Sequence, residues 1–301
     1  MIAEDLGCGE VNRTNTEQLE CLQSVKVDDL LKCASRTGPS GSQAVIDGTF
    51  LPPLDPFLPM SAKMMMVMGQ YNHDVDILLG CNKDEGLIFT APAHANHSII
   101  DNWREEWMDW RGYLYMLGLE PEDIDPIATD RLNAINQFYL GSLEHMTYEN
   151  ITQVTDMHSD SWFCYASYDF VSRHIPNVKQ NNTYQYLYTY QGEHSLFPVE
   201  EPPFGVAHAD ELFLQFYPFA DQKYNLNAED QKMSDILISL WKNFIKFGNP
   251  STQSISWNPI VDLQDRKYLY LNNTPVMKDS LKMKERMEFW DLLMNGKFDR
   301  L

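Results

Sequence analysis

The chain has 301 residues, of which 44% are hydrophobic, so it can bury a sizeable core and its composition is that of a globular protein. Twenty-three basic residues stand against 43 acidic ones, and the net charge of −20 argues against nucleic acid or an anionic membrane surface as a partner. No run approaches the roughly 18 consecutive apolar residues that a membrane span needs, so we expect none in this chain.

The N-terminal part of the chain predicts short helices and loops. Residues 1–36 form an acidic helical segment, because apolar positions three and four apart recur along them. The Gly- and Ser-containing stretch 37–42 ends this segment, and residues 44–51 then predict a short extended piece. The Met-rich run 64–68 predicts core filling, since methionine packs irregular gaps, with a methionine metal site as the alternative.

Five cysteines raise the question of disulfides. Cys8 and Cys21 bracket a polar stretch of the kind that a disulfide closes in an oxidising compartment, where it would contribute roughly 3 kcal/mol. The alternative is two free thiols. No partner is assigned to Cys33, Cys81 or Cys164, and the odd total leaves at least one thiol free or one partner missing.

The middle of the chain alternates strand and helix patterns. Residues 76–80 are a short apolar run that ends in glycine, the pattern of a strand buried on both faces of a parallel sheet. Residues 99–175 are predicted to be mostly helical, with tryptophans and tyrosines packed in the core. The aromatic, β-prone residues 184–190 predict a second strand.

The C-terminal third predicts two helices and a last strand. Residues 229–247 form a long amphipathic helix that ends at a Gly-Asn-Pro sequence, and residues 267–271 form the strand. Residues 283–293 predict a closing helix. The apolar face of the long helix comprises Met233, Ile236, Leu237, Leu240, Trp241, Phe244 and Ile245.

Alternating strands and helices predict an α/β fold with a mostly parallel sheet under helical cover. The sequence shows no internal repeat and no linker, so residues 1–301 are expected to belong to one domain. Only three or four strands are evident, which leaves the strand at residues 76–80 short of neighbours and its edge open to aggregation.

Two further groups of polar residues are interpreted as structural rather than as metal-binding or catalytic. His94 and His97 are three residues apart but have no neighbouring set of cysteines or carboxylates, so we expect no metal site. Asp156, Asp160 and Ser161 are interpreted as helix N-caps.

Five sequons of the form N-x-[ST] mark candidate glycosylation sites. They are Asn12, Asn96, Asn150, Asn181 and Asn272. Together with the candidate disulfide they favour the secretory pathway and an extracellular location. The first residues of the chain have neither a basic nor an apolar leader region, so a cytoplasmic location is the alternative.

Two residues at strand ends could form part of a hydrolase triad. Glu85 follows the strand at residues 76–80 and His208 follows the strand at residues 184–190. The carboxyl ends of parallel strands meet at one edge of a sheet, where His208 could act as a base that Glu85 orients. The alternatives are an ordinary acidic turn and a structural histidine. The chain has no G-x-S-x-G, so a nucleophilic serine is expected to precede Met1.

The residues that flank this pair carry a family resemblance. Residues 45–52 read Val-Ile-Asp-Gly-Thr-Phe-Leu-Pro, residues 80–86 read Gly-Cys-Asn-Lys-Asp-Glu-Gly, and residues 208–212 read His-Ala-Asp-Glu-Leu. In this order the motifs resemble those of the type-B carboxylesterase/cholinesterase family, with the histidine loop in the form found in invertebrate carboxylesterases. The similarity continues through residues 240–250 to the Phe-Trp pair at 289–290.

The resemblance implies an α/β-hydrolase fold, of which the chain would be the C-terminal portion. It also implies a serine-type carboxylic ester hydrolase that forms an acyl-enzyme, needs no cofactor and acts on small-molecule esters. Glu85 would be the triad acid and His208 the triad base. Phe89 and Ile88 would lie near the acyl pocket, with ordinary core packing as the alternative.

The resemblance also implies what this chain would lack. The nucleophile and oxyanion loop of the family would precede residue 1, so we expect the chain to depend on a missing N-terminal half and to be inactive alone. A non-catalytic cholinesterase-like adhesion module is the alternative function. Cys164 lies near a cysteine that forms a second disulfide in cholinesterases, but Met287 occupies the expected partner position.

Overall fold

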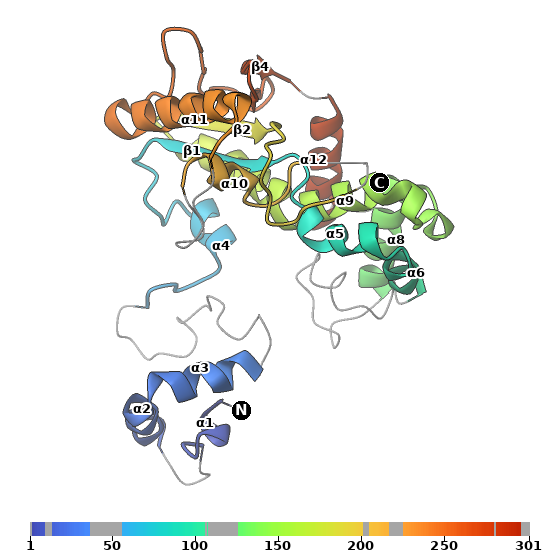
Figure 1. The fold of residues 1–301 in the computed structure, drawn as a ribbon. Coiled ribbons are helices and arrows are strands. Elements are labelled where there is room, and N and C mark those ends of the chain that lie inside the picture. Colours follow the sequence, from blue (N-terminus) through green and yellow to red (C-terminus); the bar gives the residue numbers. More distant parts are fainter. Residues whose placement is uncertain are drawn as a thin grey trace. The chain divides into compact units, whose positions relative to one another are not determined.

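The computed structural model describes most of the chain (Figure 1), namely residues 2–9, 14–36, 56–105, 107, 126–200, 205–216, 225–279 and 281–295. Its internal contacts divide the chain into two compact units, Met1–Gln70 and Tyr71–Leu301. The expectation of a single domain therefore stays a prediction. The extended piece predicted at residues 44–51 lies outside the described residues.

The described part of the predicted helical segment 1–36 is helical, with α1 (Ile2–Asp5), α2 (Asn15–Ser24) and α3 (Val27–Arg36). A further helix of the first unit, α4 (Ala62–Val67), was not predicted. Helix α2 begins with a capping box, in which the Thr14 hydroxyl accepts from the Glu17 N–H while the Glu17 carboxylate accepts from the Thr14 N–H.

A disulfide joins Cys8 and Cys21, as predicted, with 5.6 Å between their Cα atoms. Buried Cys33 belongs to neither disulfide of the described residues, and its thiol lies 3.5 Å from the Asp5 carboxylate.

The prediction of core filling for the Met-rich run is wrong for three of its members. Only Met66 is buried, whereas Met64, Val67 and Met68 are about half exposed or more. The reason is the geometry of a short helix, in which residues four apart share a face and a residue midway between them points the opposite way.

The described residues of the second unit form a four-stranded sheet in the order β1-β2-β3-β4. The strands are β1 (Ile77–Asn82), β2 (Thr183–Tyr188), β3 (Tyr268–Leu271) and β4 (Val276–Lys278). The first three are parallel and β4 is antiparallel to β3. The sequence missed β4, because three residues with exposed ends carry no strand periodicity. Strand β1 lies at the edge of this sheet, and its first four residues are only partly buried rather than buried on both faces as predicted.

Helices lie on both faces of this sheet (Figure 1). The described helices of the second unit are α5 (Leu87–Ala95), α6 (Ser98–Glu105), α8 (Pro126–Leu140), α9 (Ile151–Ser159), α10 (Tyr165–His174), α11 (Ala228–Phe247) and α12 (Leu281–Met294). Short 3₁₀ turns add η2 (Leu143–His145), η3 (Tyr148–Asn150), η5 (Ile175–Asn177) and η6 (Asp210–Leu214), and a π-helical turn, η4, spans Asp160–Cys164. Within the described residues, 99–175 are mostly helical as predicted.

Helix α11 covers one face, where Tyr184 and Tyr188 of β2 point toward it. The other face, with Leu187, packs against the larger cluster that contains residues of α8, α9 and α12. This alternation follows the two-residue period of a strand. The residues predicted to form the apolar face of α11 are buried or partly buried, except Ile245, which is 79% exposed. Ile245 lies at the edge of this face, two turns after Ile238, which is also exposed.

Asp156 and Asp160 are not helix N-caps, which corrects the sequence interpretation. Helix α9, the π turn η4 and helix α10 follow one another without a break, so both aspartates and Ser161 lie inside continuous helical structure. The Ser161 hydroxyl donates to the His158 carbonyl one turn back. The two carboxylates instead serve as partners of Arg286 on α12, a residue 126 positions beyond Asp160.

The Arg286 guanidinium donates two hydrogen bonds of 2.6 Å to the fully buried Asp160 and lies 2.7 Å from Asp156. Tyr139 donates to Asp160, and the Trp290 indole donates to Tyr139. Burial raises the pKa of Asp160 to about 6, against the opposing effect of Arg286. The cluster thus ties α8, η4 and α12 together by buried polar contacts.

Replacing Arg286 by methionine is expected to lower the free energy of unfolding by about 3–5 kcal/mol, because Asp160 would remain buried without its cation. Without Arg286 the pKa of Asp160 rises above its value of about 6 in the wild-type chain, so the native variant binds a proton at a pH where the native wild-type chain does not. The loss should therefore be largest above the pKa of Asp160 in the variant, shrink as the pH falls toward 6, and level off below 6, where both native states carry the proton. Urea denaturation at pH 7.5 and 5.5 measures both effects.

Lys284→Met on the same helix is the matched control. Lys284 lies 3.8 Å from Glu288 and both side chains are exposed, so its loss should cost only about 0–1 kcal/mol. Equal losses for the two variants would contradict the importance of the buried cluster.

Candidate active site

The first candidate residue, Glu85, lies in a tight turn between β1 and α5. The N–H of Asn82, the last residue of β1, donates to Glu85 Oε1 at 2.7 Å. Gly86 N–H donates to Ser159 Oγ at 2.8 Å, and a Cβ at Gly86 would collide with the carbonyl oxygen of Thr155. The glycine therefore lets α9 approach the turn closely, and the turn holds the Glu85 carboxylate in a buried position.

The second candidate, His208, lies in a loop that pairs with this turn. Asp84 N–H donates to the Val206 carbonyl at 3.0 Å, and Val206 N–H donates to the Asp84 carboxylate at 2.9 Å. Directly after the histidine, Ala209 adopts a left-handed backbone with φ of 67°, a conformation that costs a non-glycine residue energy. The histidine thus lies on a sharply turned segment whose backbone is hydrogen-bonded to the turn that contains Glu85.

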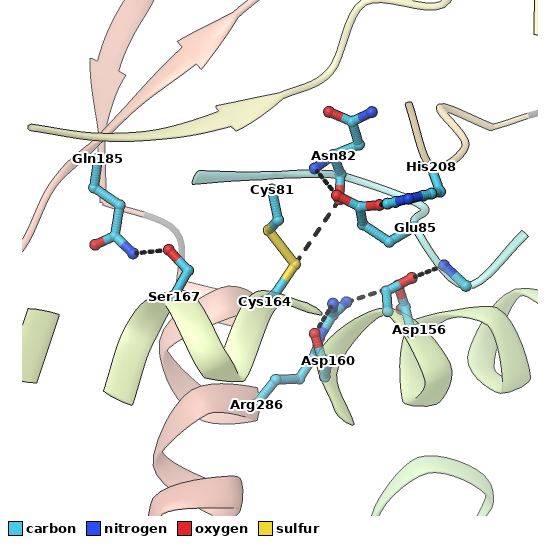
Figure 2. Close-up of a disulfide and its surroundings, with 12 residues drawn as sticks. Cys81, Asn82, Glu85, Asp156, Asp160, Cys164, Ser167, Gln185, His208 and Arg286 are labelled. Atoms are coloured by element: carbon cyan, nitrogen blue, oxygen red, sulfur yellow. Dashed lines mark hydrogen bonds and ion pairs between the residues drawn. A yellow bond between two sulfur atoms is a disulfide. The ribbon is translucent and has the colours of Figure 1, made fainter. Parts of the chain in front are cut away.

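The two candidate side chains meet. His208 Nδ1 lies 2.7 Å from Glu85 Oε2 (Figure 2), although the residues are 123 positions apart. A carboxylate can only accept, so Nδ1 carries the proton and the lone pair of neutral imidazole is on Nε2. The glutamate side chain is 8% exposed and the imidazole 41% exposed, so the carboxylate is enclosed and the imidazole is accessible.

Acidic neighbours act on the imidazole. The hydrogen bond that His208 donates to Glu85 raises the pKa of His208 above its usual 6.5, partial burial opposes this, and the charges of Glu85, Glu211 and Asp210 add to the increase. Burial raises the pKa of Asp210 to about 6 and also raises the pKa of Glu211. Asn82 connects the group, because its side-chain amide donates to Glu211 and to the Ala207 carbonyl.

A second disulfide lies beside this pair. Cys81 of β1 and Cys164 of the π turn are bonded, with 5.5 Å between their Cα atoms (Figure 2). Sequence reasoning left both cysteines unassigned, because a separation of 83 residues offers no local signal. Met287, in the position where the family resemblance placed a partner for Cys164, is a buried core residue.

The predicted pocket residues have different neighbours from the triad pair. The Phe89 ring lies 5.0 Å from the ring of His158 and 5.3 Å from that of Trp162, and Ile88 is partly buried. Their role in an acyl pocket stays a prediction. An aromatic residue that does contact the imidazole is Phe163, whose ring centroid lies 4.8 Å from that of His208 and which the sequence did not indicate.

The remaining predicted sites have these surroundings. Among the sequon asparagines, Asn96 is exposed, Asn150, Asn181 and Asn272 are partly buried, and Asn12 lies outside the described residues, so glycosylation stays a prediction.

His97 stacks on Tyr148, and His94 Nδ1 lies 3.2 Å from the Tyr148 hydroxyl. The described residues contain no group of three metal-ligating side chains and no helix long and apolar enough to cross a membrane.

Comparison with known proteins now supplies the family. The model of the carboxylesterase family matches residues 1–290. The chain belongs to this family. It is 25% identical to the pyrethroid hydrolase Ces2e of Rattus norvegicus over 100% of this chain and 49% of that protein. It is 26% identical to the para-nitrobenzyl esterase of Bacillus subtilis over 92% of this chain and 50% of that protein, and 27% identical to the bile salt-activated lipase of Bos taurus over 82% and 39%.

The fold is that of an α/β-hydrolase. The crystal structure of the juvenile hormone esterase from Manduca sexta matches with a TM-score of 0.68 at 15% identity, over 98% of this chain and 55% of that chain. The chain thus spans about half the length of the relatives that it matches. The family resemblance and the fold class expected from the sequence are confirmed.

Replacing Glu85 by glutamine tests the electrostatics of the pair. The variant should lower the pKa of His208 toward 6.5, because the amide keeps the size of the side chain but removes the charge and the strongest acceptor. NMR titration of the histidine ring protons measures the pKa, with the His208 signal assigned by its loss in His208→Gln.

Glu288→Gln on α12 is the control, since Glu288 is not among the groups that act on the imidazole. It should leave the titration of His208 unchanged. An unchanged pKa in Glu85→Gln would show that the two side chains are not paired in solution.

Proposed function

We propose that this chain supplies the acid and the base of a serine-type carboxylic ester hydrolase. The observation that carries the proposal is the 2.7 Å contact between Glu85 Oε2 and His208 Nδ1, which leaves the Nε2 lone pair of a half-exposed imidazole available. Membership of the carboxylesterase family supports ester hydrolysis as the reaction class.

The roles of the pair follow from acid–base chemistry. His208 Nε2 accepts the proton of a serine hydroxyl as its oxygen attacks the ester carbonyl, and the imidazolium then returns this proton to the departing alcohol. In the second half of the cycle it takes a proton from water and returns it to the serine as the acyl group leaves. Glu85 fixes the tautomer of the imidazole and stabilises the imidazolium in both halves.

The nucleophile is proposed to come from polypeptide outside these residues. The 301 residues contain no G-x-S-x-G, and they span about half the length of the matched relatives. We therefore propose that the chain alone is inactive and that the missing N-terminal half supplies the serine and the oxyanion donors.

Small-molecule carboxylic esters are the proposed substrate class, in keeping with the names of relatives such as the pyrethroid hydrolase and the para-nitrobenzyl esterase. The two disulfides and the sequons support a location in the secretory pathway. The reaction as derived uses only side-chain acid–base chemistry and a serine, so it needs no cofactor.

A serine-directed fluorophosphonate tests the proposal. It should not label the 301-residue chain, and it should label a protein in which this chain continues from an upstream segment with a G-x-S-x-G. In that protein His208→Gln should reduce kcat for a carboxylic ester by about 10⁴-fold or more, because the serine loses its base.

His97→Gln is the control, since His97 stacks on Tyr148 and should leave the rate within about twofold. Labelling of the 301-residue chain by the fluorophosphonate would overturn the claim that the nucleophile lies outside it. Full activity of His208→Gln would overturn the role of the histidine.

A further inference from the structure

The π turn η4 interrupts an otherwise continuous helix next to the candidate site. Turns of this kind are rare and occur frequently at functional sites, because the extra residue re-aims the side chains that follow it. This one is held at both ends. Its first residue, Asp160, receives two hydrogen bonds from Arg286, and its last residue, Cys164, is bonded to Cys81 (Figure 2).

Between these two anchors the turn presents Phe163 to the imidazole. The ring centroids of Phe163 and His208 are 4.8 Å apart and their planes are inclined by 34°. Aromatic rings at such separations attract one another, and the face of a phenylalanine also attracts a cation. Packing against Phe163 can therefore hold the neutral imidazole in place by ring–ring attraction, and it can stabilise the imidazolium by attraction between the cation and the ring face. Cys164 is the residue after Phe163, so the disulfide restrains the backbone that carries this ring.

The other half of the bridge restrains the acid. Cys81 is the residue before Asn82, whose N–H donates to Glu85 Oε1 and whose side-chain amide donates to the Ala207 carbonyl, next to His208. Cys164 Sγ also lies 3.8 Å from the Asn82 carbonyl oxygen. The disulfide thus joins Cys81, the neighbour of Asn82, to Cys164, the neighbour of Phe163. It links the segment that binds Glu85 to the segment that contacts His208.

We propose that the Cys81–Cys164 disulfide and Phe163 form a positioning unit for the acid–histidine pair, and that Phe163 keeps the imidazole seated on Glu85. This inference rests on the proposed function for its catalytic consequence, but the geometry that it concerns exists without turnover. Misplacement of a catalytic group by about 1 Å can cost about 100-fold in rate. A disulfide that restrains the positions of Glu85 and His208 would therefore affect the rate as well as the stability of the fold.

Phe163→Leu tests the contact directly. Phe163 is only partly buried, so the substitution should leave the chain folded. In NMR titrations of the 301-residue chain, the His208 ring protons should lose the upfield displacement caused by the phenylalanine ring current, and the pKa of His208 should fall toward 6.5.

Phe170→Leu is the matched control, because Phe170 makes the same kind of contact with a different histidine, at 5.2 Å from the ring of His174. It should leave the His208 signals where they are. Unchanged His208 signals and pKa in Phe163→Leu would overturn the proposal.

The double variant Cys81→Ala/Cys164→Ala tests the bridge, and Cys8→Ala/Cys21→Ala removes the other disulfide as a control. Only the first variant should shift the His208 ring protons and lower the pKa of His208. Folding of both variants is checked by near-ultraviolet circular dichroism. A folded bridge variant with the wild-type titration would overturn the proposal, and so would a variant that no longer folds, since the bridge would then serve stability.

A kinetic measurement separates this inference from the proposed function. In a protein that carries the nucleophile, loss of the bridge should reduce kcat by about 10- to 100-fold and change KM by less than about twofold. If no such protein hydrolyses esters, the proposed function fails while the NMR results still decide the positioning unit. If kcat is unchanged in an active protein, the positioning unit fails and the proposed function stands.

Discussion

The parallel pairing of β1 with β2 is the constraint on which the candidate site depends. The register places Asn82 opposite Tyr188, and the Lys83 N–H continues the ladder by donating to the Tyr188 carbonyl at 2.9 Å. Both strands therefore end at the same edge of the sheet, where the turn after β1 supplies Glu85 and the segment after β2 supplies His208. The hydrogen bonds that Asp84 makes with Val206, one through its N–H and one through its carboxylate, then hold the two side chains at hydrogen-bonding distance.

Much of this arrangement could be predicted because its signals are local. A short apolar run that ends in glycine predicts β1, an aromatic run predicts β2, and motif-like flanks single out Glu85 and His208. Phe163 and the bridge between Cys81 and Cys164 carry no such signal, since their partners are chosen by how distant elements pack. Sequence periodicity predicts single strands and helices, whereas a disulfide between residues 83 positions apart depends on how those elements pack in the tertiary structure.

The error at Asp156 and Asp160 has a physical cause. Aspartate is favoured at helix starts because its carboxylate can accept from exposed N–H groups, and sequence alone offers no competing partner. Arg286, on a helix 126 residues beyond Asp160, offers a stronger one. Replacing buried ion pairs by apolar residues is often neutral or stabilising, so such pairs are weak evidence for stability. This one connects Arg286 to Asp160, the first residue of the π turn, and so links α12 to the segment that carries Phe163.

The environment of the imidazole bears on the general-base role proposed for His208. A general base must be neutral to accept a proton and must then be stable as imidazolium, so a large increase of its pKa would aid the second step and impede the first. The Glu85 hydrogen bond and the Asp210 and Glu211 charges raise the pKa, whereas burial of the ring lowers it. Phe163, in the role we propose for it, acts with the groups that raise the pKa, because a ring that keeps the imidazole on Glu85 preserves their hydrogen bond and its face attracts the imidazolium. Partial burial of the imidazole limits this increase, whereas an additional carboxylate would favour the protonated form further.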